Sequence, residues 1–396
     1  MSKHNNILAG IDIGTQQIKV VVVRNILNKR KKNTDVEIIG YSITESRGIK
    51  NGYINDPEEV VKYLKKAIRL AEKSAGVKIK QANLSINSIG LEEYYSLGET
   101  VPVRADSEIT KIDIEKTIQD SEDKVVNKIT NKQILHKIPL RYTLDGSEIL
   151  GRPLGLKGTK LEVHSLFIVS PEQHLENIIK ITEELGIQVA NIIASPLASE
   201  SVLLTKLQKR SGCMLIDIGA ETTSIVIFED SAPISLKVFP FGSNDITNDI
   251  ALSFQIPLED ADKIKRGMSV RFNYSKRKLE ELLKNKHLEM FEVINNHLKT
   301  IGRDRLLPAG VILTGGGCRA YQLIDISKSK LSLPTEFGTN TRINNYVKNK
   351  TKAELLSTAF GLCLWDNAND YTVGVTGIIK NKSPLRLWSW ISRFLP

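Results

Sequence analysis

Two stretches of the chain share one pattern, in which an apolar run ends in Asp-Ile-Gly, a short polar turn follows and a second apolar run begins. The first covers residues 7–24 and the second covers 214–230. Apolar runs of this length, bounded by glycine and polar residues, predict buried strands. Each stretch therefore predicts a strand-turn-strand unit, and residues 36–43 predict a further strand.

Helical spacing of apolar residues begins after Asp56-Pro57, a helix start signal, and continues to Ala75. Further helices are predicted at 113–129, 171–188, 245–305 and 352–365.

The pattern of predicted strands and helices changes between about Leu84 and Leu161. A predicted strand at 84–89 leads into polar turns, and the helix 113–129 follows. An apolar strand, an Asp145-Gly146 turn, a loop rich in glycine and proline and another strand complete the segment. This order predicts a small α+β insert of about 75–80 residues.

The composition narrows the class of protein. A chain of 396 residues is too long for one ordinary domain, and no run of 18 apolar residues predicts a transmembrane helix. The N-terminus lacks the apolar core of a signal peptide. Cys213, Cys318 and Cys363 all lie in apolar runs, which predicts buried free thiols in a reducing compartment, the cytosol.

The net charge is +10, which favours acidic partners or a membrane surface. Basic residues do not alternate with aromatic ones as they do in nucleic-acid-binding stripes, so we expect no nucleic-acid partner.

The repeated Asp-x-Gly turn is the first feature that carries chemistry. A triphosphate with Mg²⁺ needs inward-facing backbone N–H groups and carboxylates that hold the metal and its water. Glycine lets the backbone approach the phosphates closely. One such turn is common in any protein, but a matched pair, at Asp12-Ile13-Gly14-Thr15 and Asp217-Ile218-Gly219-Ala220, predicts a clamp on a phosphate chain.

A glycine turn, Thr314-Gly315-Gly316-Gly317, follows a short predicted strand. Three glycines remove side chains where the flat face of a base could lie against the backbone. The GxGxxG and GxxxxGK[ST] signatures are absent from the sequence, which argues against the Rossmann and P-loop routes to nucleotide binding.

These motifs resemble those of the actin, heat-shock-70 and sugar-kinase ATPase superfamily, and within it they most resemble the FtsA family of bacterial cell-division proteins. The segments that carry the resemblance are GIDIGTQQIKV, GIKNGYINDPEEVVKYLKKAI, ILHKIPLRYTLDG, GLKGTKLEVHSLFIVSPEQHLENI, MLIDIGAETTSIVIFEDSAP, NDITNDIALSFQIPLEDADKIKRG, VILTGGG and ELLSTAFGLCLW.

The resemblance implies an α/β, actin-like ATPase fold of two pseudo-symmetric halves with an inserted small α+β subdomain. The implied ranges are 1–83 and 162–198 for subdomain 1A, to which 355–370 returns, 84–161 for the inserted subdomain 1C, 199–243 and 306–354 for subdomain 2A, 244–305 for subdomain 2B, 371–383 for a linker and 384–396 for an amphipathic helix.

The same resemblance implies nucleotide contacts from both phosphate loops, from a helix pair that holds the ribose and from the glycine turn. These residues are Asp12, Gly14, Thr15, Gln16, Asp217, Gly219, Ala220, Glu221, Thr222, Asp262, Lys265, Gly315, Gly316 and Gly317. The implied cofactors are ATP and Mg²⁺, with Asp12 and Asp217 as the metal residues.

Two departures from the family pattern concern the phosphate loops. Ser224 stands where many relatives have a carboxylate, and Glu221 adds negative charge near the phosphates. Gln16 and Gln17 stand where some relatives have a lysine. Fewer charge partners should stabilise the phosphoryl-transfer transition state less, so we expect slow ATP hydrolysis at most.

The C-terminal segment SPLRLWSWISRFLP predicts an amphipathic helix. At about 100° per residue, its apolar side chains share one face and Arg and Ser share the other, with Leu385 as the misfit. Such a helix is typical of a membrane surface, although a terminal helix docked on the core is the alternative. The predicted membrane residues are Leu387, Trp388, Trp390, Ile391, Phe394, Leu395, Arg386 and Arg393.

Residues 263–305 hold 12 Lys and Arg against 5 Asp and Glu. They fall in what resembles the subdomain through which FtsA grips the C-terminal peptide of the tubulin-like division protein FtsZ. A solvated helix face is the alternative. The candidate peptide contacts, grouped around Val270 and Phe272, are Arg266, Arg271, Lys276 and Arg277.

The implied function is an ATP-binding division protein that polymerises on the cytoplasmic face of the membrane at the septum and tethers the FtsZ ring there. Its implied partners are FtsZ, other copies of itself in a filament, an anionic membrane surface, and later division proteins bound through the insert. Two alternatives stay open. A PilM-type pilus-assembly adaptor shares the insert but lacks the tail, and a sugar or small-acid kinase of the same fold needs a catalytic Asp.

Overall fold

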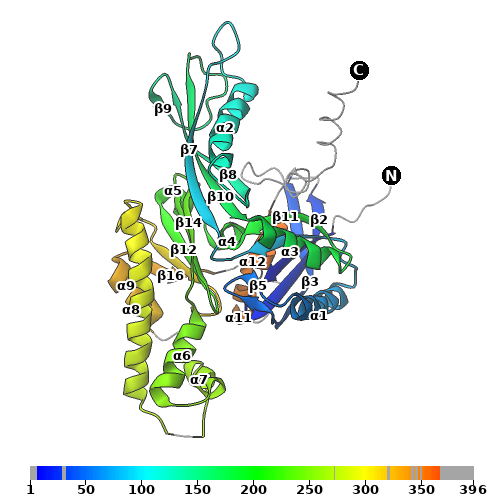
Figure 1. Cartoon of the computed structure of the whole chain (residues 1–396), viewed down its shortest axis with the longest axis vertical. Helices are drawn as coiled ribbons and strands as arrows, with labels where there is room; N and C mark the ends of the chain where they lie inside the picture. Colours follow the sequence, from blue (N-terminus) through cyan, green and yellow to red (C-terminus); the bar gives the residue numbers. More distant parts are fainter. Residues whose placement is uncertain are drawn as a thin grey trace.

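The computed structural model describes residues 7–28, 33–271, 273–318, 322–339, 343, 347 and 350–365. Two five-stranded sheets form the centres of two halves, and a third sheet projects from them (Figure 1). Both large sheets have the same plan, since a central strand pairs with an antiparallel hairpin on one side and two parallel strands on the other. The duplication predicted from the sequence is confirmed.

The first sheet contains, in spatial order, β11 (Gln188–Ala194), β6 (Gln81–Ile86), β1 (Ile7–Ile13), β2 (Gln17–Asn28) and β3 (Asn33–Glu45). The second contains β14 (Ala232–Phe239), β13 (Thr223–Glu229), β12 (Cys213–Ile218), β15 (Val311–Thr314) and β16 (Thr335–Phe337). A short hairpin, β4 (Ile49–Lys50) with β5 (Tyr53–Ile54), follows β3.

The helices of the first half cover its sheet. They are α1 (Pro57–Ala75), α3 (Glu172–Glu183), α4 (Ser195–Leu203), α11 (Lys350–Leu355) and α12 (Ser357–Leu364). The helices of the second half are α5 (Lys206–Ser211), α6 (Ser243–Phe254), α7 (Leu258–Lys265), α8 (Lys276–Thr300) and α9 (Leu323–Leu331).

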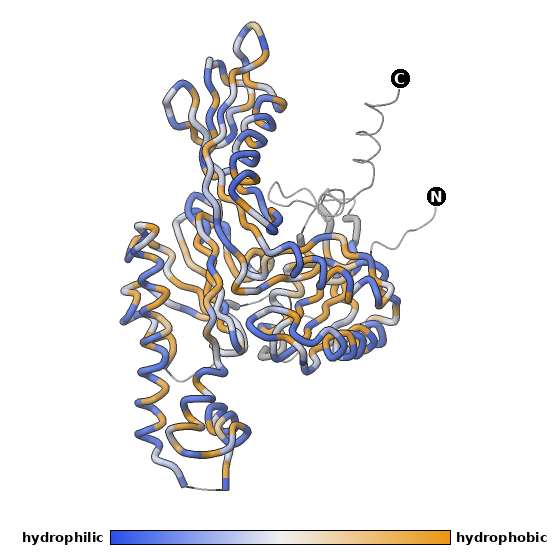
Figure 2. The backbone as a smooth tube through the Cα atoms, viewed as in Figure 1, coloured by the Kyte–Doolittle hydropathy of each residue, from blue (hydrophilic) through white to orange (hydrophobic). Residues whose placement is uncertain are grey.

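Helix α1 forms as its sequence predicts. The Asp56 carboxylate accepts the N–H of Glu59 and caps the helix, and Gly76 ends it in the left-handed conformation with φ of 68°. The apolar residues predicted for its inner face are all buried: Val60, Leu64, Ala67, Ile68 and Ala71. Figure 2 shows the resulting mixture of hydrophobic and hydrophilic residues along the outer helices.

The last helices return to the first half. Helix α12 lies against β1 so closely that a Cβ on Gly10 would stand 2.0 Å from the carbonyl oxygen of Ala359. On its other face a Cβ on Gly361 would stand 1.9 Å from the carbonyl oxygen of Ala198 in α4. The predicted helix 352–365 is interrupted at Leu356, so α11 and α12 are separate.

The insert is a four-stranded sheet with one helix on its face. Its strands are β7 (Glu92–Thr100), β10 (Leu161–Pro171), β8 (Lys132–Leu144) and β9 (Ser147–Ile149), and its helix is α2 (Lys111–Val126). Asp145 and Gly146, both with positive φ, form the predicted two-residue turn between β8 and β9.

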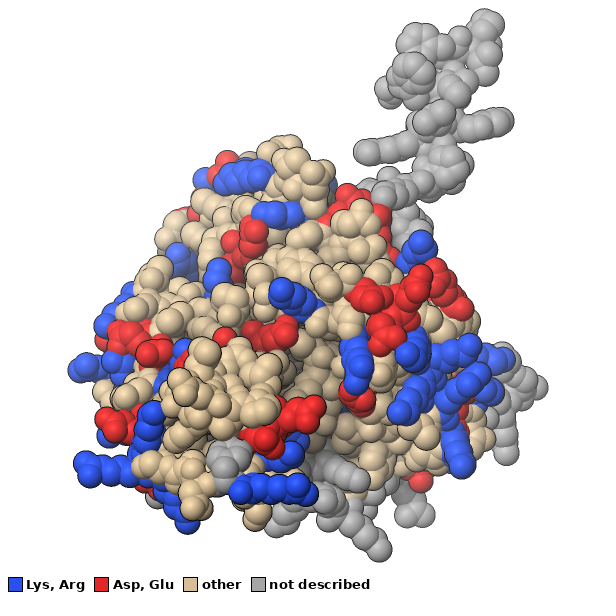
Figure 3. Space-filling view, turned by 60° about the horizontal axis from the view of Figure 1, so that its bottom comes forward, with Lys and Arg blue, Asp and Glu red and all other residues tan. Residues whose placement is uncertain are grey.

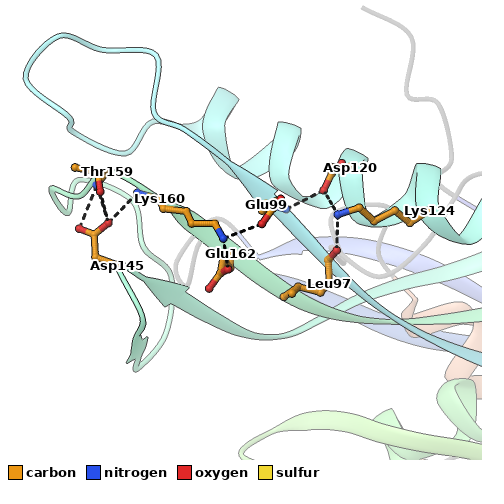
Figure 4. Close-up of polar contacts among 8 residues, drawn as sticks. All are labelled: Leu97, Glu99, Asp120, Lys124, Asp145, Thr159, Lys160 and Glu162. Atoms are coloured by element: carbon orange, nitrogen blue, oxygen red, sulfur yellow. Dashed lines mark hydrogen bonds and ion pairs between the residues drawn. The ribbon is translucent and has the colours of Figure 1, made fainter.

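Polar contacts hold this sheet together (Figure 4). Asp145 accepts hydrogen bonds from both the N–H and the hydroxyl of Thr159, and from the N–H of Lys160. The Lys160 ammonium pairs with Glu99 and Glu162 at 2.8 Å each, which ties β10 to β7. Asp120 of α2 accepts the N–H of Glu99 and so joins the helix to the same edge.

The insert contacts both halves. His136 on β8 accepts the N–H of Ala194, at the end of β11, at 3.0 Å. On the other side, the Glu93 carboxylate accepts the N–H of Leu236, and the Tyr95 hydroxyl donates to the carbonyl oxygen of Ile234 at 2.9 Å. The insert therefore contacts an edge strand of each large sheet, β11 in the first and β14 in the second.

Two features of the insert differ from the prediction. Residues after the first strand were expected to be polar turns, but 92–100 forms β7, because it pairs with β10 along its whole length. The expected range 84–161 also differs, since Leu84 pairs within the first sheet while β10 continues the insert sheet to Pro171.

Asp113, buried at the start of α2, gives a test of what stabilises the insert. Its carboxylate accepts hydrogen bonds from the N–H and hydroxyl of Thr110 and from the N–H of Val103. Burial opposes ionisation, but these hydrogen bonds outweigh it and hold the pKa of Asp113 below its ordinary value.

Asp113→Ala is expected to lower the free energy of unfolding by about 1–3 kcal/mol at neutral pH, because three donors lose their acceptor. Since the folded state binds the proton less tightly than the unfolded state, the stabilisation is full above about pH 4 and disappears as the pH falls through the lowered pKa. Urea unfolding at neutral and acidic pH measures both effects. Glu115→Ala, an exposed change on the same helix, is the control, and an equal loss in both variants would contradict the assignment.

Candidate functional site

A cleft between the two halves collects the predicted phosphate loops and glycine turn. It is lined by eleven of the fourteen predicted nucleotide residues: Asp12, Gly14, Thr15, Gln16, Asp217, Gly219, Ala220, Thr222, Gly315, Gly316 and Gly317. These residues come from the ends of β1, β12 and β15, so three strands of two sheets deliver them to one place.

The two phosphate loops have equivalent backbone geometry. The N–H of Gly14 donates to the carbonyl oxygen of Gln17 at 3.1 Å, and the N–H of Gly219 donates to that of Thr222 at 2.9 Å. Each hydrogen bond closes a tight turn between antiparallel strands. The backbone of the two turns therefore lies at the cleft in the same conformation, since the same hydrogen bond closes each.

Lys19 lies directly across the first hairpin from Asp12 and is a site residue that the sequence analysis missed. Its ammonium donates to Asp12 Oδ2 at 2.8 Å, and the hydroxyl of Ser85 donates to Oδ1 at 2.7 Å. Burial lowers the pKa of Lys19, but the carboxylates of Asp12 and Asp217 outweigh it and raise that pKa above its ordinary value. Lys19 therefore brings one cation to the cleft, where it is paired with Asp12.

Asp217 occupies the equivalent position in the second hairpin, opposite Ser224. Burial raises the pKa of the Asp217 carboxyl to about 6, with Lys19 acting against this rise and Asp12 adding to it. Ser224 is buried, and its hydroxyl has no hydrogen-bond partner among the described residues. The second hairpin therefore has no counterpart of Lys19 at this register position.

The glycine turn packs directly on the second phosphate loop. Gly315 has φ of 96°, and a Cβ there would stand 2.2 Å from Asp217 Oδ1. The N–H of Gly317 donates to the carbonyl oxygen of Ile218 at 2.8 Å, and a Cβ on Gly317 would meet the Ile218 side chain at 2.7 Å. Only glycine fits at both positions without displacing Asp217 or its neighbour.

The three remaining predicted residues lie beside the cleft. Glu221 and Asp262 line a neighbouring hollow that shares Gln16 with it. Lys265 donates to the carbonyl oxygen of Ser243 and the hydroxyl of Thr247, and it pairs with Asp262 at 3.2 Å. Burial lowers the pKa of Lys265, although Asp262 acts against this. The contact of Asp262 and Lys265 with a ribose, and that of Glu221 with the phosphates, stay predictions.

Further lining residues were not predicted, and no local sequence signal marks them. Asn87 and Ser195 approach from the first half, and Glu354, Ser357 and Thr358 come from the helices that return to it. The last three reach the cleft because α12 packs against β1, a contact between segments more than three hundred residues apart in the sequence.

The cleft suits a magnesium–phosphate complex. Mg²⁺ commonly binds through one or two carboxylates together with substrate phosphates and water. In the described part of the chain, no three His, Cys, Asp or Glu side chains are grouped so that they could hold a metal ion. Asp12 and Asp217 with a phosphate chain would fit such a coordination.

Residues 263–305, the basic segment, contain both exposed charges and charges paired within the protein. Arg266, Arg271, Lys276 and Arg277 are all exposed, and Arg266 also pairs with Asp262 at 2.7 Å. Val270 packs against the core of the second half, and Phe272 lies outside the described residues. Figure 3, which brings this end of the molecule forward, shows Lys and Arg side chains gathered at both margins of the view.

The predicted linker and amphipathic tail, from 371 to 396, lie outside the described residues. Within the part that is described, none of the helices has the length and apolarity needed to cross a bilayer. The three cysteines are buried and free, as predicted.

Comparison with known proteins gives two family matches. The model of "Cell division protein FtsA" matches residues 214–361, and that of the "SHS2 domain inserted in FTSA" matches residues 93–169. The chain is 30% identical over 387 residues to the cell division protein FtsA of Buchnera aphidicola subsp. Baizongia pistaciae, covering 90% of each chain. It is 26% identical over 415 residues to that of Escherichia coli (strain K12), covering 98% of this chain and 96% of that protein.

Solved structures support the fold. The PilM-PilN type IV pilus biogenesis complex matches with a TM-score of 0.69 at 15% identity, covering 90% of this chain and 97% of that one. MreB 5 of Spiroplasma citri bound to AMPPNP matches with a TM-score of 0.52 at 12% identity, covering 96% and 99%. The predicted α/β, actin-like ATPase fold with an inserted subdomain is confirmed.

The raised pKa of Asp217 predicts how metal–nucleotide binding depends on pH. A carboxylate binds a metal when it is deprotonated, so affinity for Mg²⁺–ATP should rise as the pH rises through 6. Between about pH 5 and pH 7.5 the expected gain is about tenfold for one group of this pKa. Calorimetry with Mg²⁺ present measures it.

Asp217→Asn is the matched control, because it keeps the shape of the side chain and cannot ionise. Protonation of ATP itself affects both proteins equally, so the difference between them isolates Asp217. A pH dependence that is the same in both proteins would rule out Asp217 as the titrating group.

Proposed function

The chain belongs to the FtsA family of bacterial cell-division proteins, and from this premise we propose that it binds Mg²⁺–ATP in the cleft, assembles into filaments and tethers the FtsZ ring to the cytoplasmic face of the membrane at the septum. The observation that carries the proposal is the cleft itself, which Asp12 and Asp217 from two equivalent hairpins line together with a glycine turn. The family membership favours this function over a pilus adaptor or a sugar kinase.

The nucleotide part of the proposal rests on the charges in the cleft. Asp12 and Asp217 would hold Mg²⁺, which would neutralise phosphate charge when bound. The positive charge of Lys19 interacts favourably with both carboxylates. The backbone of each phosphate loop is fixed by the hydrogen bond that closes its turn. Ser224 in place of a carboxylate is consistent with slow hydrolysis.

Self-assembly is supported by exposed apolar residues at opposite ends of the long axis (Figure 1). At the insert end, Val101, Val103 and Leu150 are 70%, 68% and 99% exposed. At the other end, Leu252 and Leu258 are 77% and 57% exposed. A head-to-tail contact between copies would cover both groups and repeat without closing, as a filament requires.

The loops at the insert end are well held. The N–H of Ile109 donates to the carbonyl oxygen of Leu156 at 2.8 Å, and the N–H of Gly158 donates to that of Ser107 at 3.0 Å. A surface of fixed shape loses little entropy on binding, which suits a contact with another copy or with a later division protein.

For the membrane anchor, we expect the double variant Trp388→Glu with Phe394→Glu to bind nucleotide normally and to stay in the supernatant when vesicles of anionic lipid are sedimented. The loss of two large apolar side chains should reduce the bound fraction at least about tenfold. Binding of the unmodified protein should also increase with ATP-dependent assembly, since many weak tails act together.

The matched control is Ser389→Glu with Ser392→Glu, which adds the same charges on the predicted polar face. It should keep most of the binding. Equal sedimentation of the apolar-face variant and the unmodified protein would show that the tail is a docked element and does not anchor the chain.

For the peptide contact, reversing two exposed charges with Arg271→Glu and Arg277→Glu should weaken binding of an acidic FtsZ C-terminal peptide about tenfold at low salt and flatten its salt dependence. Fluorescence titration of the labelled peptide measures both effects. Lys299→Glu with Arg305→Glu reverses exposed charges near the far end of α8 and should change little. The segment is excluded as the contact if both double variants bind alike.

A further inference from the structure

The segment Gly48–Asp56 is part of the family resemblance, and among its residues only Gly52 lines the cleft. It forms the β4–β5 hairpin, whose tip is Asn51-Gly52 with φ of 49° and 79°. Two successive residues with positive φ are the turn that Asn-Gly favours in two-residue hairpins. In Figure 1, β5 lies at the edge of the first half that faces the second half.

The hairpin is fixed to the first half. The carbonyl oxygen of Gly48 accepts the N–H groups of Asn55 and Asp56, at 2.7 and 3.0 Å. Gly52 lies so close to the segment after β6 that a Cβ there would stand 2.1 Å from the carbonyl oxygen of Asn87. The Tyr53 ring packs on His174 of α3, with ring centroids 4.7 Å apart.

From this fixed position the tip reaches the second half. The N–H of Asn51 donates to Glu221 Oε2 at 2.7 Å, between residues that are 170 positions apart. A second, longer contact runs alongside, since the Asn87 amide donates to the hydroxyl of Thr222 at 3.4 Å. A hydrogen bond therefore links the hairpin of the first half to the second phosphate loop of the second half.

Glu221 stands in the loop between Ala220 and Thr222, which both line the cleft. That loop is closed by the Gly219–Thr222 hydrogen bond and backed by α6, because the N–H of Asn244 donates to the carbonyl oxygen of Ala220 at 2.8 Å. Any ligand that orders the loop from the cleft side also sets the position of the Glu221 carboxylate on the other side.

We propose that the Asn51-Gly52 tip and Glu221 form a clasp through which nucleotide in the cleft holds the two halves closed. The proposal rests on the proposed nucleotide site and adds the contact that couples this site to closure. Glu221 and Asn51 act as positioning residues, and neither lines the phosphate cleft itself.

The coupling has an electrostatic reason. A carboxylate in a phosphate loop repels the phosphates if it turns toward them, and it is least unfavourable where an N–H donor holds it away. Closure supplies that donor, so closure and binding of a polyanion favour each other. Opening the cleft releases the carboxylate and weakens binding of the same polyanion, as reciprocal linkage requires.

The test is amide hydrogen exchange of the 48–56 segment in the full chain, with and without AMPPNP and Mg²⁺. In the unmodified protein, the nucleotide should slow exchange at the tip at least about tenfold, the factor expected for one charge-assisted hydrogen bond. Glu221→Ala should lose this slowing and bind AMPPNP about tenfold more weakly. Glu221→Gln keeps an acceptor oxygen but loses the charge, so it should retain only part of the slowing.

Two further variants separate the clasp from general effects. Glu259→Ala removes an exposed carboxylate from the same neighbouring hollow and should behave like the unmodified protein. Gly52→Ala leaves Glu221 intact but displaces the hairpin from Asn87. Because Gly52 also lines the cleft, this variant tests the clasp only through exchange at the tip, where it should reproduce the loss of slowing seen in Glu221→Ala.

The outcomes distinguish the clasp from the nucleotide site. If the unmodified protein does not bind AMPPNP by calorimetry, the proposed nucleotide function fails. If it binds and the tip is slowed equally in Glu221→Ala, the clasp is refuted while the nucleotide site stands. Loss of the slowing in Glu221→Ala and Gly52→Ala, with Glu259→Ala unaffected, supports the clasp.

Discussion

The placing of two carboxylates, Asp12 and Asp217, in one cleft where burial disfavours their charged forms is the constraint on which the site depends. Both stand at the ends of buried strands and line one cleft. Among the described residues that line it, Lys19 carries the only Lys or Arg side chain, and it donates to Asp12. Asp217 keeps a pKa raised to about 6 despite Lys19. The protein alone therefore leaves negative charge incompletely balanced, and a divalent cation with a phosphate chain is the chemistry that balances it.

The rest of the architecture serves to hold this arrangement in place. Each carboxylate comes from the central strand of a sheet, where neighbours on both sides fix its backbone. Gly315 can approach Asp217 only because it has no side chain, and its positive φ aims the glycine turn at the second loop. The cleft is thus built from strand ends, whose backbone is held by strand pairing, and from glycines, which leave room for a ligand.

Much of this was predictable because the decisive information is local. The Asp-Ile-Gly turns, the apolar strands around them and the capped helix after Asp56 all depend on residues close in sequence, and each forms where predicted. Lys19 was missed because its role depends on hairpin register, although a lone lysine in an apolar strand was a usable signal. The contact of Glu221 with Asn51 depends on how two halves meet, which no local pattern encodes.

The insert shows the same limit at its boundaries. Composition changes near Leu84 and Leu161, but strand pairing decides which sheet a residue joins. Leu84 pairs with Ile11 in the first sheet, and the buried run to Pro171 pairs with β7 and β8. A change in composition therefore shows that an insert is present but does not locate its boundaries. Those boundaries depend on which sheet each strand joins, and one strand can continue past the point where the composition changes.

Helix α12 and the basic segment lie in different halves of the molecule. Trp365 is buried with its ring 5.8 Å from that of His136, and the carbonyl oxygen of Leu362 accepts the Asn83 amide at 2.8 Å. Helix α12 therefore belongs to the first half, whose sheet carries Asp12. The basic segment belongs to the second half, beyond the cleft. If the tail holds a row of copies on a membrane, opening or closing the cleft moves the basic segment relative to that membrane, so nucleotide in the cleft can adjust how a partner peptide is presented without touching either the peptide or the lipid.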